Sequence, residues 1–184
     1  MSEWMTSSQP YLAPRDSASP DPWRAEAARA GHIGGHRLVL VERRVPAERV
    51  SILLGIDPGA AAVLRRRVVT LDDRPVEISD SWYPAPIADG TPLAENRPIK
   101  GGALRALADL GYAATRHVEE LAVIDTPPPL RDLLPDSPVI ELTRTSYTAD
   151  DVPFETAVML MARDMAPGIP RRLRYELKSD AGTP

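Results

Sequence analysis

The stretch RRRVVTLDDRPVEISDSWYP, residues 65–84, has the pattern of a β-hairpin. Two runs rich in valine, isoleucine, threonine and aromatic residues flank the segment DDRP, which is typical of a tight turn. We therefore predict strands over residues 62–71 and 76–83. Three consecutive arginines, Arg65 to Arg67, stand inside the first strand, which is unusual for a half-buried element.

Side-chain alternation divides these arginines between the two faces of a sheet. Arg65 and Arg67 share one face, and Arg66 points to the other. One interpretation is an edge strand whose arginines extend to solvent along their aliphatic stems. The other is a cavity lined by the sheet, in which one or two arginines bind a carboxylate or phosphate with their planar guanidinium groups.

The second strand of the hairpin presents a polar row that suits hydrogen bonding to a ligand and that plain solvent exposure would also explain. The row consists of Glu77, Ser79, Ser81 and Tyr83. Farther along, KGGALRAL places Gly101 and Gly102 directly before a predicted helix. Free N–H groups at a helix start bind anions, although helices often begin with glycine where no ligand binds.

The composition limits the function classes. The chain has 184 residues, 43% of them hydrophobic, and a net charge of −4, so it can form one domain with a core and has no general attraction to nucleic acid. It contains no cysteine, no apolar run of membrane-spanning length and no apolar signal-peptide core. We expect a cytoplasmic protein without membrane contact. In the absence of a P-loop, a nucleophile elbow and a metal-ligand spacing, we predict no catalytic residue, metal or cofactor.

Three parts are expected along the chain: an N-terminal arm or linker over residues 1–37, a compact domain over 38–178 and a C-terminal tail over 179–184. The arm is expected to be extended rather than packed, with one short helix that starts at Pro22 and ends at Gly31. Its aromatic residues favour a segment that lies across the surface of the domain or of a partner.

Inside the domain, hydrophobic periodicity predicts further strands over residues 38–45, 114–124, 137–148 and 153–162, and short helices over 46–55, 101–112 and 126–134. Residues 114–124 also suit a helix because of their glutamates. The two hairpins in this order point to an antiparallel sheet with helices on one side, hence an α+β fold. The end of the domain is expected to be irregular.

An ordered set of short motifs resembles a known family. The set is L-G-x-x-P-G, R-R-x-x-x-x-D-x-x-P-V, Y-P, a helix ending in L-G, P-V-x-x-L-x-R-x-x-Y, P-F-E and R-D. Over roughly residues 38–178, the chain is similar to the UTRA domain, the effector-binding half of the HutC branch of the GntR-type bacterial transcription regulators.

This resemblance implies a fold like that of chorismate lyase, with a central antiparallel sheet, flanking helices and a small-molecule effector pocket between them. It implies that Arg67 faces the pocket, that Arg65 flanks it, and that Arg66 is solvated or ion-paired. Such domains usually form homodimers. In complete regulators, an N-terminal winged helix-turn-helix binds DNA, and the effector changes the spacing of the two DNA-binding heads.

The chain departs from the family pattern in two places. The residues before the domain contain no winged helix-turn-helix, so we expect no direct DNA binding by this chain, which would be an isolated effector module or a stand-alone protein. Phosphosugar-binding members use two alternating arginines, an acidic residue and a serine, and the corresponding positions here are Arg67, Val69, Ser79 and Gly102. We therefore expect an effector that is less charged or more apolar than a phosphosugar.

The candidate ligand-binding residues are Arg65, Arg67, Ser79, Ser81, Tyr83, Gly101, Gly102, Glu119, Arg144 and Glu155. The leading hypothesis is a small-molecule sensor and dimerisation domain of a GntR/HutC-type regulator, acting as a homodimer or in trans as a heterodimer with a full-length regulator. The alternative is a stand-alone enzyme of lyase or isomerase type, in which Arg67 orients a carboxylate and Glu119 or Glu155 is the acid or base.

Overall fold

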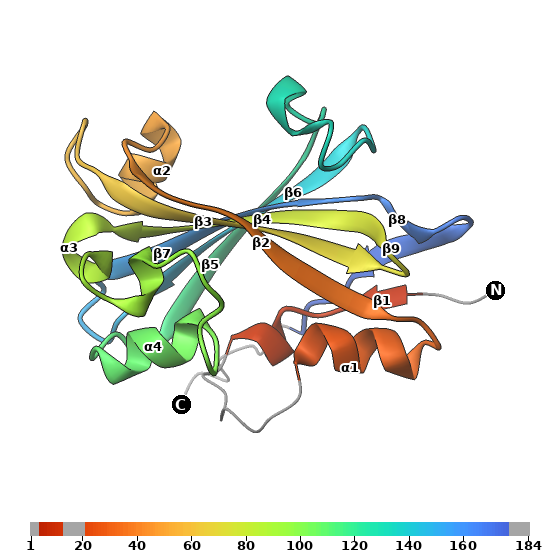
Figure 1. Ribbon diagram of the computed structural model, residues 1–184, viewed down its shortest axis with the longest axis horizontal. Helices are drawn as coiled ribbons and strands as arrows, with labels where there is room; N and C mark the ends of the chain where they lie inside the picture. Colours follow the sequence, from red (N-terminus) through yellow and green to blue (C-terminus); the bar gives the residue numbers. More distant parts are fainter. Residues whose placement is uncertain (1–3, 13–20, 177–184) are drawn as a thin grey trace, which may run out of the picture.

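A six-stranded antiparallel sheet forms the centre of the computed structural model, which describes residues 4–12 and 21–176 (Figure 1). Its strand order is β2-β3-β4-β7-β6-β5. The strands are β2 (Gly34–Arg44), β3 (Ala62–Leu71), β4 (Arg74–Pro84), β5 (Arg116–Ile124), β6 (Val139–Tyr147) and β7 (Pro153–Met161). The sheet and its helices confirm the predicted α+β class, and residues 114–124 are a strand rather than a helix.

The hairpin predicted from residues 65–84 lies in the middle of this sheet. β3 begins and ends where the sequence predicts. Asp72 and Asp73, with φ of 48° and 64°, connect it to β4. Two consecutive residues in the left-handed region give a turn whose twist matches that of the flanking strands. Because β3 pairs with β2 on one side and β4 on the other, the interpretation of an edge strand is wrong.

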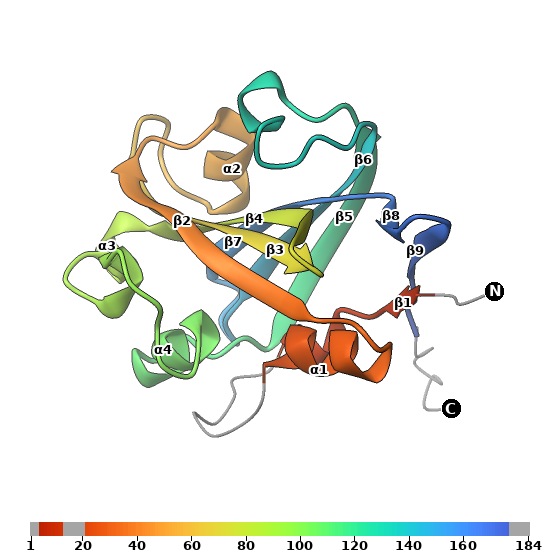
Figure 2. The same ribbon diagram turned by 45° about the vertical axis from the view of Figure 1, so that its right-hand side comes forward.

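Helices cover both faces of the sheet, whereas the sequence led us to expect them on one side only (Figures 1 and 2). On the first face, α2 (Glu48–Leu53) packs over Leu64 and Trp82. On the same face, the segment that contains the 3₁₀ helix η3 (Pro128–Leu130) buries Leu134. Apolar side chains project from both sides of β3 and β4, so each side needs a cover.

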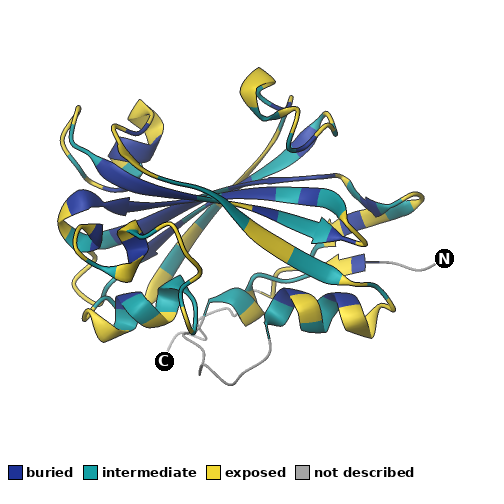
Figure 3. Ribbon diagram, viewed as in Figure 1, coloured by how far each residue is buried: buried dark blue, intermediate teal, exposed yellow. Residues whose placement is uncertain are grey.

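The second face carries three short elements: α3 (Ala85–Ala88), the 3₁₀ helix η2 (Pro92–Ala94) and α4 (Ala103–Asp109). Leu93 and Leu107 from these elements meet Phe154 of β7, and all three side chains are fully buried. Figure 3 shows the buried residues concentrated in the central strands, with exposed residues on the outer sides of the helices. This face holds the site described below.

The N-terminal segment also packs on the protein, through β1 (Trp4–Thr6), η1 (Gln9–Tyr11) and α1 (Pro22–Arg29). The expectation of an unpacked arm is wrong for these residues, whereas the expectation that the aromatic residues of this segment lie across the domain is confirmed. Trp4 and Trp23 are buried in one cluster with Leu71 and Val76 of the hairpin, with ring centroids 5.8 Å apart. The reason is that two indole rings cover apolar side chains that the end of the hairpin would otherwise expose.

β1 is held by a second, three-stranded sheet at the C-terminal end of the domain. It pairs in parallel with β9 (Ile169–Leu173), which in turn pairs with β8 (Asp164–Ala166). The end of the domain is therefore regular where the sequence predicted irregular structure. The predicted tail over 179–184 and residues 13–20 of the predicted arm lie outside the described residues. No described helix combines the length and the apolar character that a bilayer crossing requires.

One carboxylate of α1 ties this segment together. Glu26 accepts hydrogen bonds from Trp4 Nε1 at 2.7 Å and Thr6 Oγ1 at 3.3 Å on one oxygen, and from Tyr11 Oη at 2.9 Å on the other. A charged acceptor makes stronger hydrogen bonds than a neutral one. The three donors come from β1 and η1, so Glu26 fixes both elements against α1.

We expect Glu26→Gln to lower the free energy of unfolding by about 1.5 kcal/mol, because an amide accepts on one atom only and its NH₂ group faces a donor. Urea unfolding followed by circular dichroism measures the loss. Arg29→Ala, on the exposed side of α1, is the control. An unchanged midpoint in Glu26→Gln would mean that packing of the tryptophans alone holds the segment.

Candidate functional site

A cavity of about 200 Å³, here the inner cavity, lies on the second face of the sheet. Alternate residues of β3, β4, β7 and β6 form its floor, because the antiparallel register sets them in neighbouring rows. The floor residues are Arg67, Ser79, Ser81, Glu155, Ala157, Met159, Leu142 and Arg144, and the opposite wall includes Tyr11, Trp23, Gly101, Gly102 and Leu104. The N-terminal segment and the start of α4 therefore close the space over the sheet.

A second cavity of about 640 Å³, here the outer cavity, adjoins the first. Arg67, Ser81, Gly101 and Gly102 line both cavities. The other walls of the outer cavity come from α1, β2 and the loop over residues 96–99. A ligand held in the inner cavity can thus extend along the Arg67 side chain into the outer one.

The three arginines of β3 have three different environments. Arg66 lies on the first face and makes a bidentate ion pair with Asp80 of β4, at 2.7 and 2.6 Å, which confirms the prediction of an ion-paired residue. Arg67 is exposed toward the two cavities, and its guanidinium makes no hydrogen bond or ion pair with any residue in 4–12 or 21–176. Arg67 is therefore the cation of the run that a ligand can engage.

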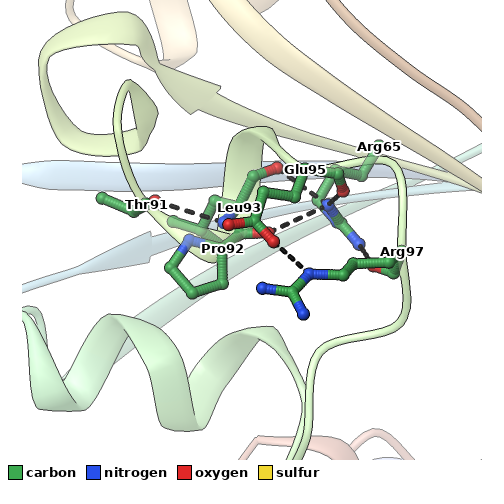
Figure 4. A network of polar contacts seen from close by, with 6 residues as sticks. All are labelled: Arg65, Thr91, Pro92, Leu93, Glu95 and Arg97. Carbon is green, nitrogen blue, oxygen red and sulfur yellow. Dashed lines mark hydrogen bonds and ion pairs between the residues drawn. The ribbon is translucent and has the colours of Figure 1, made fainter.

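Arg65 lies on the same face as Arg67, but its guanidinium is bound by the protein backbone. It is 6% exposed and donates to four backbone carbonyls of the loop after α3, as Figure 4 shows. The acceptors are Pro92 O, Leu93 O, Glu95 O and Arg97 O, at 2.7 to 3.3 Å. Burial lowers the pKa of the Arg65 guanidinium. Its terminal nitrogens are occupied, so it supports the wall of the outer cavity, and a ligand contact by Arg65 stays a prediction.

A buried acid and a buried phenol stand beside Arg67 on the cavity floor. Tyr83 Oη donates to Glu155 Oε1 at 3.0 Å. A β-bulge between Ser146 and Tyr147 leaves Phe154 of β7 as an extra residue, so Phe154 packs beneath α4 while the adjacent Glu155 lines the cavity. Burial raises the pKa of Glu155, and the hydrogen bond from Tyr83 and the neighbouring arginines oppose this rise. Burial also raises the pKa of Tyr83.

The raised pKa of Glu155 makes stability depend on pH. The folded state binds the proton more tightly than the unfolded state, so this contribution is complete below the unfolded pKa and is lost as the pH rises through the folded pKa. We expect Glu155→Gln, whose oxygen still accepts from Tyr83, to be more stable than the wild type at pH about 8 and to lose this part of the pH dependence. Urea unfolding at pH about 5 and about 8 measures it.

The control for this measurement is Glu48→Gln, at an exposed position of α2. It should leave the difference between the two pH values as in the wild type. Equal pH dependence in the wild type and in Glu155→Gln would show that the Glu155 carboxyl titrates alike in the folded and unfolded chains.

An ion pair connects the far side of the cavity to the N-terminal segment. Arg144 Nε donates to Glu119 Oε1 at 2.6 Å, and Ser8 Oγ donates to Glu119 Oε2 at 3.1 Å. Beside them, His117 Nδ1 lies 3.1 Å from Ser146 Oγ. Burial lowers the pKa of His117, and the nearby Arg144 lowers it further. Glu119 therefore orients a cation that lines the cavity and also holds the segment that covers it.

The candidate residues predicted from the sequence come together at this place. Most line the inner cavity, whereas Arg65 and Tyr83 line only the outer one, and Glu119 reaches the site through Arg144. Gly101 and Gly102 have φ of 79° and 85° before α4, which has only seven residues. An anion bound by such a short helix stays a prediction.

Several lining residues were not predicted. Among them are His36, His117, Leu142, Ser146, Met159, Met161, Tyr11 and Trp23. Alternation along residues 114–124 would have placed His117 on the face of Glu119, had the strand been certain. Leu142 and the methionines add apolar side chains to the floor, in the same rows across the sheet as Arg67 and Glu77. For Tyr11 and Trp23, the sequence offers only their unusual presence in a polar segment.

The chain resembles known proteins both in sequence and in fold. A model of the UTRA domain matches residues 29–166. The chain is similar to PhnF from Mycobacterium smegmatis, with 20% identity and a TM-score of 0.69 over 96% of this chain and 73% of that chain. It is similar to the effector domain of PhnF, with 23% identity and a TM-score of 0.66 over 89% of this chain and 98% of that one.

A third solved structure, the ligand-binding domain of a GntR-family transcriptional regulator from Bordetella bronchiseptica, has 25% identity and a TM-score of 0.62 over 79% of this chain and 91% of that chain. No curated protein matches the chain. The structural similarities agree with the predicted chorismate lyase-like fold.

Proposed function

The chain belongs to the UTRA-domain family, and on that premise we propose that it binds a small-molecule effector and that this binding regulates transcription in a GntR-type system. One observation carries the proposal. In the inner cavity, the guanidinium of Arg67 has no partner among the described residues and lies beside the buried Glu155–Tyr83 pair. A cation without a protein partner in a concave site is suited to an acidic ligand group.

The lining supports a proposal for the chemical class of the effector. Arg67 takes a carboxylate or similar acidic group, and the hydroxyls of Ser79 and Ser81 offer hydrogen bonds nearby. Leu142 and Met159, on the two strands beyond Ser79 in the same row, take an apolar body. The effector that fits the inner cavity best is thus a small acid with an apolar part.

The N-terminal segment is the element through which binding would be transmitted. Tyr11 and Trp23 line the cavity, and Ser8 contacts Glu119, the partner of Arg144. A ligand that touches these side chains binds one position of the segment better than another and shifts the population toward it. We propose that the chain does so as a homodimer of the HutC type, or in trans with a full-length regulator.

Thermal unfolding in the presence of amino acids, carboxylated aromatic compounds, sugars and phosphosugars tests the proposal. A ligand at about 100 times its Kd, bound only by the folded state, adds about 2.7 kcal/mol of stability. We expect Arg67→Ala to weaken binding of an acidic effector by about tenfold, because one charge-assisted hydrogen bond pair is lost. Arg105→Ala, on the exposed side of α4, is the control with the same change of charge.

Catalysis is the second function to be weighed, because Glu155 is a buried acid with a raised pKa inside the cavity. The effector proposal predicts that a bound ligand is recovered unchanged after long incubation. Conversion of the ligand by the wild type, abolished in Glu155→Gln, would instead establish an enzyme. No stabilising ligand in any class would remove the basis of the effector proposal.

A further inference from the structure

The outer cavity differs from the rest of the protein in its charge. Five arginines line it, namely Arg24, Arg37, Arg65, Arg67 and Arg97, against the single carboxylate of Asp21. The whole chain, by contrast, has a formal net charge of −4. A cavity lined by one sign of charge raises the local concentration of ions of the other sign.

Two of these arginines are already engaged. Arg65 holds the backbone carbonyls of the loop after α3, and Arg97 is paired with Glu95. The side chains of Arg24, Arg37 and Arg67 make no hydrogen bond or ion pair with any of the residues described in this structure. All three residues line the outer cavity, so it is bordered by three arginines whose side chains have no partner among the described residues.

These three arginines come from three separate elements. Arg24 lies in the first turn of α1. Its backbone N–H donates a hydrogen bond to the side chain of Asp21, the N-cap of this helix. Arg37 pairs with Val68 in the register of β2 and β3, and it lines the outer cavity beside Leu38, the partner of Arg67. The fold thus brings a helix and two adjacent strands to one opening, and it does so next to the inner cavity.

Resting on the proposed effector function, we infer that the outer cavity is a second subsite of the same ligand, which takes a polyanionic oxyanion group of at least two negative charges. Guanidinium groups bind phosphate and carboxylate oxygens bidentately, and Arg24 and Arg37 match a group with several such oxygens, while Arg67, which lines both cavities, lies between this group and the acid of the inner cavity. The effector is then elongated, with an apolar, acidic part in the inner cavity and a polyanionic end between α1 and β2.

A polyanionic ligand differs from the weakly charged one that the sequence led us to expect. That expectation followed from Val69 and Ser79, which replace charged contacts within the hairpin. The additional positive charge comes from Arg24 and Arg37, which lie outside the hairpin. The comparison of hairpin positions with the phosphosugar-binding pattern covers β3 and β4 only and therefore does not include these two arginines.

Inorganic pyrophosphate and citrate are the probes for the subsite, titrated calorimetrically at constant ionic strength. We expect both pyrophosphate and citrate to bind the wild type. The double variant Arg24→Ala/Arg37→Ala should weaken this binding by at least about tenfold. Both positions are exposed, so the double variant should fold. Arg43→Ala/Arg105→Ala is the matched control, because it removes the same charge at exposed positions outside both cavities.

The results distinguish a phosphate-type from a carboxylate-type group, and they test the subsite separately from the effector function. Tighter binding of pyrophosphate supports a phosphate-type end, and tighter binding of citrate supports a polycarboxylate end. Absence of binding to the wild type, or equal loss in both double variants, overturns the subsite. If a small acid still stabilises the wild type through Arg67 while neither polyanion binds, the effector function stands and only the subsite falls.

Discussion

Arg65→Met is expected to lower the free energy of unfolding by about 3 kcal/mol. Methionine fills much of the space of the aliphatic stem, but it leaves four carbonyl oxygens without their donor. The oxygen of Leu93 is buried and cannot turn to water, and an unsatisfied buried acceptor costs about 1–3 kcal/mol by itself. The remaining loss comes from the loop over Pro92 to Arg97, whose inward-turned carbonyls share Arg65 as their donor.

Arg67→Met is the matched control for this measurement, since it makes the same substitution two residues away on the same face of β3. It should change stability by no more than about 0.5 kcal/mol, because the wild-type side chain has no partner among the described residues. Arg65→Lys should fall between the two, as one ammonium group cannot reach both Leu93 and Arg97. Urea unfolding followed by circular dichroism ranks the three variants, and equal effects of both methionine substitutions would show that the carbonyl contacts do not stabilise the fold.

Phe154→Ala is expected to cost about 4 kcal/mol. Phe154 is the one phenylalanine of the chain and is fully buried between β7 and α4, with its ring centroid 5.9 Å from that of Tyr112. Removing the ring leaves a cavity lined by Leu93 and Leu107, which short elements hold in place and which can collapse only in part.

Phe154→Leu keeps most of the volume and should cost about 1.5 kcal/mol or less. The difference between the leucine and alanine variants in guanidinium unfolding isolates the contribution of the filled space. A loss below about 1.5 kcal/mol for Phe154→Ala would indicate that α4 moves in to close the gap.

The hairpin shows how far local sequence determines this fold. Alternation and turn composition predicted β3 to the residue, and they placed Arg65 and Arg67 on one face. What separates these two arginines is the loop over residues 92–97, which has no periodicity and carries no sign that its carbonyls turn inward. A contact between residues about thirty positions apart follows from the packing of α3 and η2, which the hairpin sequence does not encode.

The bulge at Phe154 and the packing of the N-terminal segment are two further features that local sequence patterns did not predict. Strict alternation sets Phe154 and Glu155 on opposite faces, but an extra residue in β7 lets both serve the second face. Burial of Trp4 depends on the pairing of β1 with β9, at the other end of the chain. The sequence therefore predicted most of the cavity floor, which lies on regular strands, but not its cover.

The tryptophans of this chain are distributed unevenly around the cavity. Trp23 lines it, Trp4 packs against Trp23, and Trp82 lies on the opposite face of the sheet under α2. Because two indoles lie in or next to the cavity wall and the third lies on the other face, intrinsic fluorescence should change when a ligand binds in the cavity. In a Trp82→Phe variant, all tryptophan emission would come from Trp4 and Trp23, so a single titration with selective excitation of tryptophan would report both that a compound has entered and that the N-terminal segment has responded.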